Sequence, residues 1–233
     1  MERIIERTDD GSATLFVPEL NEHYHSTKGA RTESQHIFID MGLKASPAAT
    51  PRVLEIGFGT GLNAWLTLEE AERSRRNIHY IGLELYPLDW QTVEQLGYIS
   101  SDEQLTIHRK QTTTDEQFTP NEEKQQSAIE LFKQLHTSPW EKDVQLTPHF
   151  TLRKIETDVN KWRVENSPFN LVYFDAFAPE KQPEMWSQEL FNRLYVLLDR
   201  DGILTTYCAK GVVRRMLQTA GFTVERLPRT SGW

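Results

Sequence analysis

Several features common in metal-binding, secreted and membrane proteins are missing from this sequence. It has a single cysteine, Cys208, so no internal disulfide can form, and no Cys/His cluster has the spacing of zinc ligands. No stretch approaches the roughly 18 consecutive apolar residues of a membrane-spanning helix. The first residues, MERIIERTDDGS, lack the apolar core of a secretion signal. These absences predict a cytoplasmic protein that binds no metal and no membrane.

The sequence also has little positive charge. With 26 Lys and Arg against 34 Asp and Glu, its net charge is −8, which argues weakly against general nucleic-acid binding. The charge is unevenly distributed, because the last 24 residues carry five Lys and Arg side chains against one acid, Glu225. The sequence therefore still allows a local basic surface on a protein that is acidic overall.

Strand and helix patterns alternate along most of the 233 residues. Expected strands cover 52–57, 78–85, 149–159, 170–174, 202–208 and 221–227, and expected helices cover 62–75, 87–96, 187–198 and 212–220. This alternation predicts the α/β class, with a Rossmann-like, doubly wound and mostly parallel sheet in one domain spanning 1–233. On the helix 62–75 we expect i,i+4 ion pairs between Glu69 and Arg73 and between Glu72 and Arg76.

Two segments fall outside this alternation. Residues 13–45 are expected to form a small N-terminal β segment with strands at 13–20 and 35–43. Residues 97–148 are more polar and are interpreted as an insertion, in which SAIELFKQLH (127–136) has the pattern of an amphipathic helix.

The stretch LEIGFGTGLN (54–63) joins a strand directly to a helix. Gly57 and Gly59 permit a tight turn and a close approach of the backbone to a ligand, and the helix beyond Gly61 begins with free N–H groups. A dinucleotide-binding G-x-G-x-x-G motif would need glycine at position 62, where this sequence has Leu62. The pattern acid-x-Gly-x-Gly-x-Gly is instead the form used by S-adenosylmethionine (SAM) methyltransferases.

Acids near this turn complete the expected cofactor site. Glu84 ends the next strand, where a carboxylate can accept hydrogen bonds from both ribose hydroxyls. Asp158 can bind an adenine amino group or can be a solvated loop acid, and Glu55 can instead cap a neighbouring turn. The candidate cofactor-binding residues are Glu55, Gly57, Gly59, Thr60, Gly61, Asn63, Glu84 and Asp158.

A second acid follows an apolar strand in NLVYFDAFAPEKQPEMW (170–186). Four apolar residues lead into Asp175 and a loop that contains proline. The carboxyl edge of an open α/β sheet is where ligands bind, so Asp175 is a candidate catalytic residue. The alternative is that its side chain caps the loop 176–184 or the helix that follows.

Four strings resemble the methyltransferase part of MnmC-type tRNA-modifying enzymes: YHSTKGARTESQHIFI, EIGFGTGLN, YFDAFAPEKQPEMW and VVRRMLQTAGFTVERL. In that family the domain uses SAM to methylate the amine of 5-aminomethyl-2-thiouridine at the tRNA wobble position. Many members are fused to a flavin-dependent oxidase that makes this amine. The resemblance implies SAM as cofactor, tRNA as partner, a separate FAD-dependent oxidase as a candidate partner, and a loop around Tyr24, His25, Ser26 and Glu33 that covers the cofactor. Members usually continue into a basic, glycine-rich tail, so we expect that a C-terminal tail is missing after LPRTSGW.

This chemistry gives roles to the remaining candidates. Methyl transfer from SAM is an in-line displacement, in which catalysis is mostly positioning. Asp175 could aim the lone pair of a neutral amine or take its proton as a general base. Because a nearby carboxylate raises the pKa of an ammonium group, we favour orientation.

Substrate contacts are expected from five further residues. Phe177 and Pro179 would form a wall beside the target base, whereas Lys181 could meet phosphate or be solvated. Arg214 and Arg215 point away from the expected apolar face of their helix and could grip the phosphate backbone, or form an ordinary solvated face. That apolar face comprises Val212, Val213, Met216, Leu217 and Ala220.

Two other functions stay open. The chain could be a SAM-fold transferase for a small-molecule amine, which would not need the outward arginine pair. It could also be a non-catalytic SAM-binding subunit of a tRNA-modification complex, a role against which the intact Asp175 argues. The fold alone does not choose between them.

Overall fold

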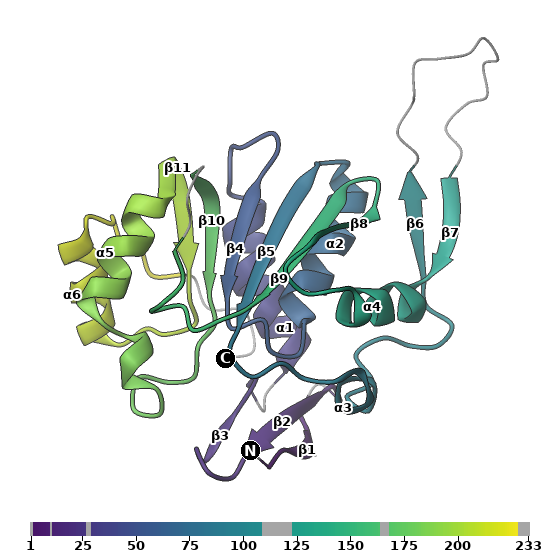
Figure 1. Ribbon diagram of the computed structural model, residues 1–233, viewed down its shortest axis with the longest axis horizontal. Helices are drawn as coiled ribbons and strands as arrows, with labels where there is room; N and C mark the ends of the chain where they lie inside the picture. The colour runs from purple at the N-terminus through teal and green to yellow at the C-terminus, as the bar shows by residue number, and fades with distance from the viewer. Residues whose placement is uncertain (1, 10, 27–28, 109–122, 164–167, 228–233) are drawn as a thin grey trace.

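A six-stranded sheet forms the centre of the computed structural model, which describes residues 2–9, 11–26, 29–108, 123–163 and 168–227. The strand order is β11-β10-β4-β5-β9-β8 (Figure 1). Five strands run parallel, and β8 is antiparallel to β9. Their bounds are β4 Arg52–Ile56, β5 Ile78–Glu84, β8 Asp143–Thr147, β9 Phe150–Glu156, β10 Phe169–Phe174 and β11 Leu198–Thr205. The predicted α/β class with a mostly parallel sheet is confirmed.

Helices cover both faces of this sheet because its central strands are apolar on both sides. Along β10, Leu171 and Tyr173 join one buried cluster, while Val172 and Phe174 join the other. The first cluster packs against α1 (Ala30–Ser34), η1 (Gln35–Leu43), α2 (Leu62–Ser74) and α4 (Ala128–Thr137). The second packs against α5 (Gln188–Leu197) and α6 (Gly211–Ala220).

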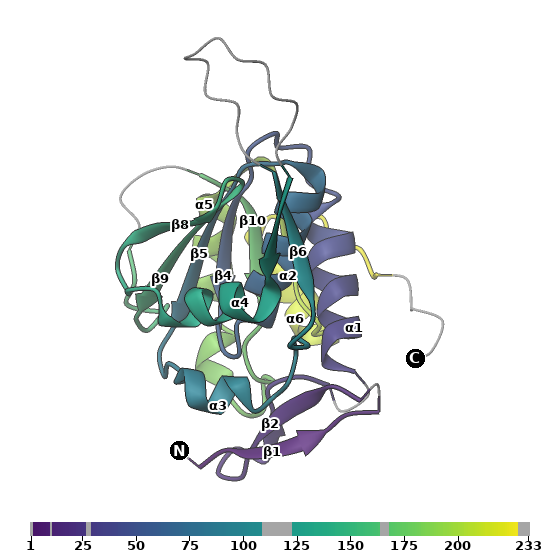
Figure 2. The same ribbon diagram turned by 90° about the vertical axis from the view of Figure 1, so that its right-hand side faces the viewer.

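The N-terminal residues form a separate three-stranded sheet of β1 (Ile4–Arg7), β2 (Ala13–Val17) and β3 (Glu22–His23). It lies below the central sheet in both views (Figures 1 and 2). The strand predicted at 35–43 is wrong, because the π-helix η1 occupies these residues. Ile37, Phe38 and Ile39 are consecutive and buried, so they lack the two-residue alternation of a half-buried strand. The N-terminal segment is therefore β-structured only in its first part.

The predicted insertion shares the central sheet. It contains α4, as expected, and a hairpin of β6 (Gln104–His108) and β7 (Glu123–Ser127). It also supplies β8, which pairs with β9 at the sheet edge, so the expected boundary at residue 148 does not separate it from the domain. Residues 109–122 lie outside the described residues.

Two predicted elements differ from the structure, one in its bounds and one in its existence. The helix expected from Pro87 begins instead at Trp90, as α3 (Trp90–Glu94), because Asp89 caps it by accepting a hydrogen bond of 2.7 Å from the Thr92 N–H. The strand predicted at 221–227 is wrong, since these residues join none of the sheets in the described part of the chain. Residues 228–233, after which the tail was expected to be missing, lie outside the described residues.

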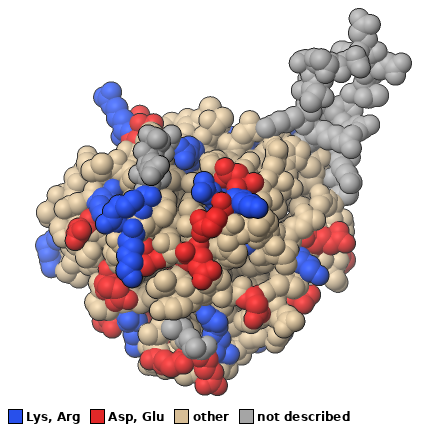
Figure 3. Space-filling model, in the orientation of Figure 1, with Lys and Arg blue, Asp and Glu red and all other residues tan. Residues whose placement is uncertain are grey.

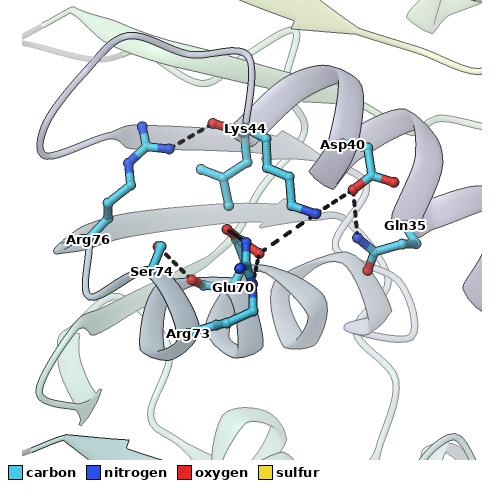
Figure 4. A network of polar contacts seen from close by, with 8 residues as sticks. Gln35, Asp40, Lys44, Glu70, Arg73, Ser74 and Arg76 are labelled. Carbon is cyan, nitrogen blue, oxygen red and sulfur yellow. Dashed lines mark hydrogen bonds and ion pairs between the residues drawn. The ribbon is translucent and has the colours of Figure 1, made fainter.

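The two i,i+4 ion pairs expected on α2 are wrong, because this helix is packed on several sides. Arg31 makes hydrogen bonds of 2.9 and 2.8 Å to the Glu69 carboxylate, and Arg73 pairs with Glu70 instead. Glu72 is fully buried and accepts a hydrogen bond from the backbone of His149. Figure 4 shows the Glu70 network beside η1.

Arg76 binds the backbone of the segment that follows η1. Its guanidinium donates to the carbonyl oxygens of Leu43, Ser46 and Ala48 at 3.0, 3.1 and 2.6 Å. One cation thus satisfies three backbone acceptors where the helix ends.

No helix among the described residues is long and apolar enough to cross a membrane.

Candidate functional site

A cavity of about 530 Å³ opens at the carboxyl ends of β4, β5 and β10. Its walls come from the glycine turn after β4, the end of β5, the loop after β10 and the N-terminal segment. This volume is in the range of small-molecule sites. Of the predicted residues, the lining includes Gly57, Gly59, Thr60, Asn63, Glu84, Asp158, Asp175 and Phe177. The predicted residues from four segments of sequence therefore meet in one place.

The glycine turn needs its glycines. Gly57, Gly59 and Gly61 have φ angles of 90°, 49° and 71°, which side chains rarely adopt. A Cβ on Gly57 would lie 2.5 Å from the carbonyl oxygen of Asp175, and one on Gly61 would lie 2.6 Å from Nε2 of His136. Gly57 thus lets the two loops touch, whereas Gly61 packs against α4 and does not line the cavity.

Glu84 ties this turn to the end of β5. Its Oε2 accepts a hydrogen bond of 2.8 Å from the Gly59 N–H, and Oε1 accepts bonds of 2.9 Å from the N–H groups of Leu85 and Tyr86. Each carboxylate oxygen has two lone pairs, so Oε1 uses both and Oε2 keeps one lone pair for a ligand hydroxyl in the cavity.

Two residues of the N-terminal segment line the cavity, Tyr24 and His25. Tyr24 packs edge-on against Phe177, with the ring centroids 5.0 Å apart. His25 Nε2 lies 2.7 Å from the hydroxyl of the buried Thr60, and burial lowers the pKa of His25 to about 4. The imidazole is therefore neutral near pH 7. That this loop covers a bound cofactor stays a prediction.

Asp158 lies across the cavity, after β9. Its Oδ1 accepts a hydrogen bond of 2.9 Å from the Asn160 N–H, and its Oδ2 lies 3.6 Å from the ammonium group of Lys161. The side chain is thus oriented by its own loop. The role of Asp158 toward adenine stays a prediction.

Asp175 is held by the first turn of α2. Asn63 Nδ2 donates a hydrogen bond of 2.8 Å to Oδ2 of Asp175 and another of 2.9 Å to Oε1 of Glu55. Asn63 and Asp175 line the cavity, whereas Glu55 is fully buried behind them and does not. Burial raises the pKa of Asp175 to about 7, against the Asn63 hydrogen bond, and the charge of Glu33 adds to the rise.

The loop after Asp175 is fixed by Trp186. The Trp186 indole N–H donates a 2.8 Å hydrogen bond to the Phe177 carbonyl, and its ring packs on Phe174. Pro179 and Lys181 belong to this loop but do not line the cavity. Sequence reasoning missed Tyr207, whose hydroxyl donates to the Ala176 carbonyl at 2.9 Å, because its position after β11 carries no motif.

The predicted phosphate contacts lie apart from this cavity. Arg214 and Arg215 are exposed on α6, as expected from the helix pattern. Arg214 lines a second hollow of about 1240 Å³ beside β11, which shares Glu33 and Tyr207 with the first cavity. On the same helix Val213 and Leu217 are buried, but Val212 is 44% exposed, so its expected place in the core is wrong.

A family model described as S-adenosyl-L-methionine-dependent methyltransferase matches residues 119–232. A protein of Cupriavidus metallidurans named tRNA 5-methylaminomethyl-2-thiouridine biosynthesis bifunctional protein MnmC is 28% identical over 242 residues, covering 100% of this chain and 34% of that protein. A protein of the same name from Magnetococcus marinus is 28% identical over 227 residues, covering 92% of this chain and 30% of that protein. The chain spans about a third of the length of these curated relatives.

A solved structure supports the same fold. The crystal structure of MNMC2 from Aquifex aeolicus has a TM-score of 0.67 and 23% identity, covering 95% of this chain and 65% of that chain. The predicted resemblance and α/β fold are confirmed. The cofactor that the family match indicates is SAM, in agreement with the glycine turn.

The residues present fit this cofactor. Gly57 and Gly59 line the cavity, so the backbone of this turn can lie close to a ligand without an intervening side chain. Asn63 Oδ1 is buried at the cavity and has no hydrogen-bond partner within the part of the chain that the structure describes. A buried acceptor of this kind suits an ammonium group such as that of methionine.

Proposed function

We propose that this chain, a relative of the SAM-dependent methyltransferases, converts 5-aminomethyl-2-thiouridine to 5-methylaminomethyl-2-thiouridine at the tRNA wobble position. The substrate and the reaction come from the names of its relatives and from the motifs that it shares with them. We further propose that residues 1–233 act as one methyltransferase domain, which takes its amine substrate from a separate FAD-dependent oxidase in the cytoplasm.

The observation that carries this proposal is the placement of Asp175. Its carboxyl lies at the edge of the cavity, held from one side by Asn63, next to the turn assigned to the cofactor. A carboxyl with a pKa of about 7 can be ionised and can accept a proton at the pH of the cell. A subunit that only binds SAM would not need such a group there.

When bound, SAM supplies an electrophilic methyl group on a sulfonium. Asp175 accepts a hydrogen bond from the acceptor amine and turns the nitrogen lone pair toward that methyl. Asp175 could also take the proton that the amine loses once it has been methylated. Holding the nitrogen in line accounts for most of the acceleration that we ascribe to the protein.

The acceptor side of the cavity suits a base on an amine-bearing arm. Phe177 and Tyr24 present ring edges and faces beside Asp175, and apolar walls hold extruded bases by close contact. We assign Glu84 to the ribose of the cofactor, Asp158 to its adenine, and Gly57, Gly59, Thr60 and Asn63 to its methionine part.

The test is direct. The chain is incubated with labelled SAM and with tRNA lacking the methylated wobble uridine, and the nucleosides are then analysed. We expect label in the wobble nucleoside for the wild type and at least a hundredfold slower labelling for Asp175→Asn, in line with the loss of a positioned proton acceptor. Label transferred only to free amines would favour the small-molecule transferase, and SAM binding without transfer would favour the non-catalytic subunit.

A further inference from the structure

Two acids on neighbouring strands are linked through one amide. The Nδ2 group of Asn63 carries two hydrogens, and it bonds Glu55 at 2.9 Å and Asp175 at 2.8 Å. Both hydrogens are therefore used, so the amide cannot rotate without losing one of the two bonds. The direction of the bond to Asp175 depends on Glu55.

Glu55 has no access to a ligand in the cavity. Its side chain is 0% exposed and lies behind Asn63, whereas Asn63 and Asp175 reach the cavity wall. The acid of the glycine-turn pattern therefore faces the protein interior. Its Oε1 accepts the hydrogen bond of 2.9 Å from the Asn63 amide.

We propose that Glu55 is a positioning residue, which fixes the Asp175 carboxylate at the cavity edge through the amide of Asn63 and does not contact the cofactor. This inference rests on the proposed function, because it assumes that Asp175 is the group that meets the acceptor amine. It reassigns Glu55, which the glycine-turn pattern placed among the cofactor ligands.

The charges around the pair agree with this role. Burial raises the pKa of Glu55 well above its usual range, against hydrogen bonding from Tyr80 and Asn63, while Asp175 and Glu84 add to the rise. A neutral Glu55 still accepts the Asn63 bond through its carbonyl oxygen, but it adds no second negative charge beside Asp175.

Asp175 then remains as the group whose charge changes near neutral pH. The titratable groups that face it from the surrounding elements are Glu33 of α1, Glu55 of β4, Tyr80 of β5 and Tyr207 after β11. Burial raises the pKa values of both tyrosines, so they stay neutral in this range.

The experiment compares Glu55→Leu, Glu55→Gln, Asn63→Leu and the double variant Glu55→Leu/Asn63→Leu in the full chain. Glu72→Leu is the matched control, because Glu72 is an equally buried acid that instead binds the backbone of His149. The readouts are the titration of the Asp175 side-chain carboxyl by carbon-13 NMR, the dissociation constant of SAM, and the pH profile of methylation.

We expect Glu55→Leu and Asn63→Leu each to move the Asp175 titration about one pH unit upward, as loss of a charged hydrogen bond implies. The double variant should shift it no further, because the two residues act through one bond. Glu55→Gln should restore the wild-type titration and most of the turnover that Glu55→Leu loses. SAM affinity should stay within about twofold in both Glu55 variants, and Glu72→Leu should leave the Asp175 titration in place.

Three results would overturn the inference: an Asp175 titration in Glu55→Leu that matches Glu72→Leu, additive shifts in the double variant, or weaker SAM binding in Glu55→Gln. If Glu55→Leu does not fold, the Glu55→Gln and Asn63→Leu titrations decide. Because NMR needs no tRNA, a wild type that fails to methylate tRNA would refute the proposed function and still leave this comparison decisive.

Discussion

Asp175 combines a buried site with a single strong donor, and this combination has an energetic cost. Its pKa of about 7 in the fold lies far above the reference value of 3.8, mainly because burial disfavours the charge. Ionisation of the Asp175 carboxyl, which the proposed catalysis requires, therefore destabilises the folded state. Catalysis and stability should therefore respond to pH in opposite directions.

This opposition can be measured in the unfolding free energy. Between about pH 4 and pH 7 the folded state retains a proton on Asp175 that the unfolded chain has released, so this residue's contribution to stability falls as pH rises. Asp175→Asn cannot ionise. We expect its stability relative to the wild type to be greater at pH 8 than at pH 5 in urea titrations. Asp201→Asn, at an exposed site, is the control, and an equal difference at both pH values for Asp175→Asn would contradict the assignment.

Glu84 contributes to binding through geometry as well as charge. We expect Glu84→Ala to weaken SAM by about 1.5–3 kcal/mol in calorimetry, the range for hydrogen bonds to a charged group. Stability should also fall, because the N–H groups of Gly59, Leu85 and Tyr86 lose their acceptor. Glu22→Ala, which removes another acid from the same cavity, should have a small effect. Unchanged affinity in Glu84→Ala would remove Glu84 from the cofactor site.

The residues of the site differ in how far sequence reveals them. Glu84 and Asp175 were predictable because each follows an apolar strand, and parallel strands bring their carboxyl ends to one edge. The link from Asn63 to Asp175 joins residues 112 positions apart, and no local pattern encodes it. Tyr207 was missed for the same reason.

Helix surfaces were the hardest elements to predict, because they depend on what packs against them. The i,i+4 pattern on α2 was present in the sequence, but α1 and η1 cover that side of the helix. Glu69 therefore pairs with Arg31, and Arg76 donates hydrogen bonds to backbone carbonyl oxygens. The strand predicted at 35–43 failed similarly, since an apolar run of that length suits a buried helix as well as a strand. The central strands β4, β5 and β10 were found because their apolar runs are buried on both faces, whereas the edge strand β8, in which only Thr147 is buried, was not predicted.

This packing predicts unequal roles for two neighbouring arginines on α2 and its end. Arg76 binds three carbonyl oxygens and Arg73 forms a pair with Glu70 while its side chain is 66% exposed (Figure 4). We expect Arg76→Ala to cost about 2–4 kcal/mol of unfolding free energy, because buried carbonyls lose a charged donor. Arg73→Ala should cost less than about 1 kcal/mol, as exposed pairs do. Equal costs in urea unfolding would show that the Arg76 contacts contribute little.

The protein has a net charge of −8, and its proposed partner, tRNA, is also negatively charged, so the two repel each other overall. Figure 3 shows lysine and arginine interspersed with acids on the face in view, without a region of one sign. Phosphate contacts supply most of the affinity in nucleic-acid complexes, so a local cluster of cations is needed. Arg214 and Arg215 lie together on the exposed side of α6, next to the hollow that adjoins the cavity.

Reversing both charges should therefore weaken tRNA binding and leave SAM binding unchanged. In the wild type the logarithm of the binding constant should fall linearly with the logarithm of the salt concentration, and Arg214→Glu/Arg215→Glu should make this slope shallower by about two phosphate contacts. Lys133→Glu/Lys142→Glu is the matched control, because it changes the net charge equally at exposed residues of α4 and the segment before β8, at the opposite end of the sheet (Figure 1). Its slope should match the wild type, since these residues lie far from the hollow beside β11 that Arg214 lines. Equal slopes in all three proteins would mean that tRNA docks on another face, and the arginine pair would then be an ordinary solvated helix surface.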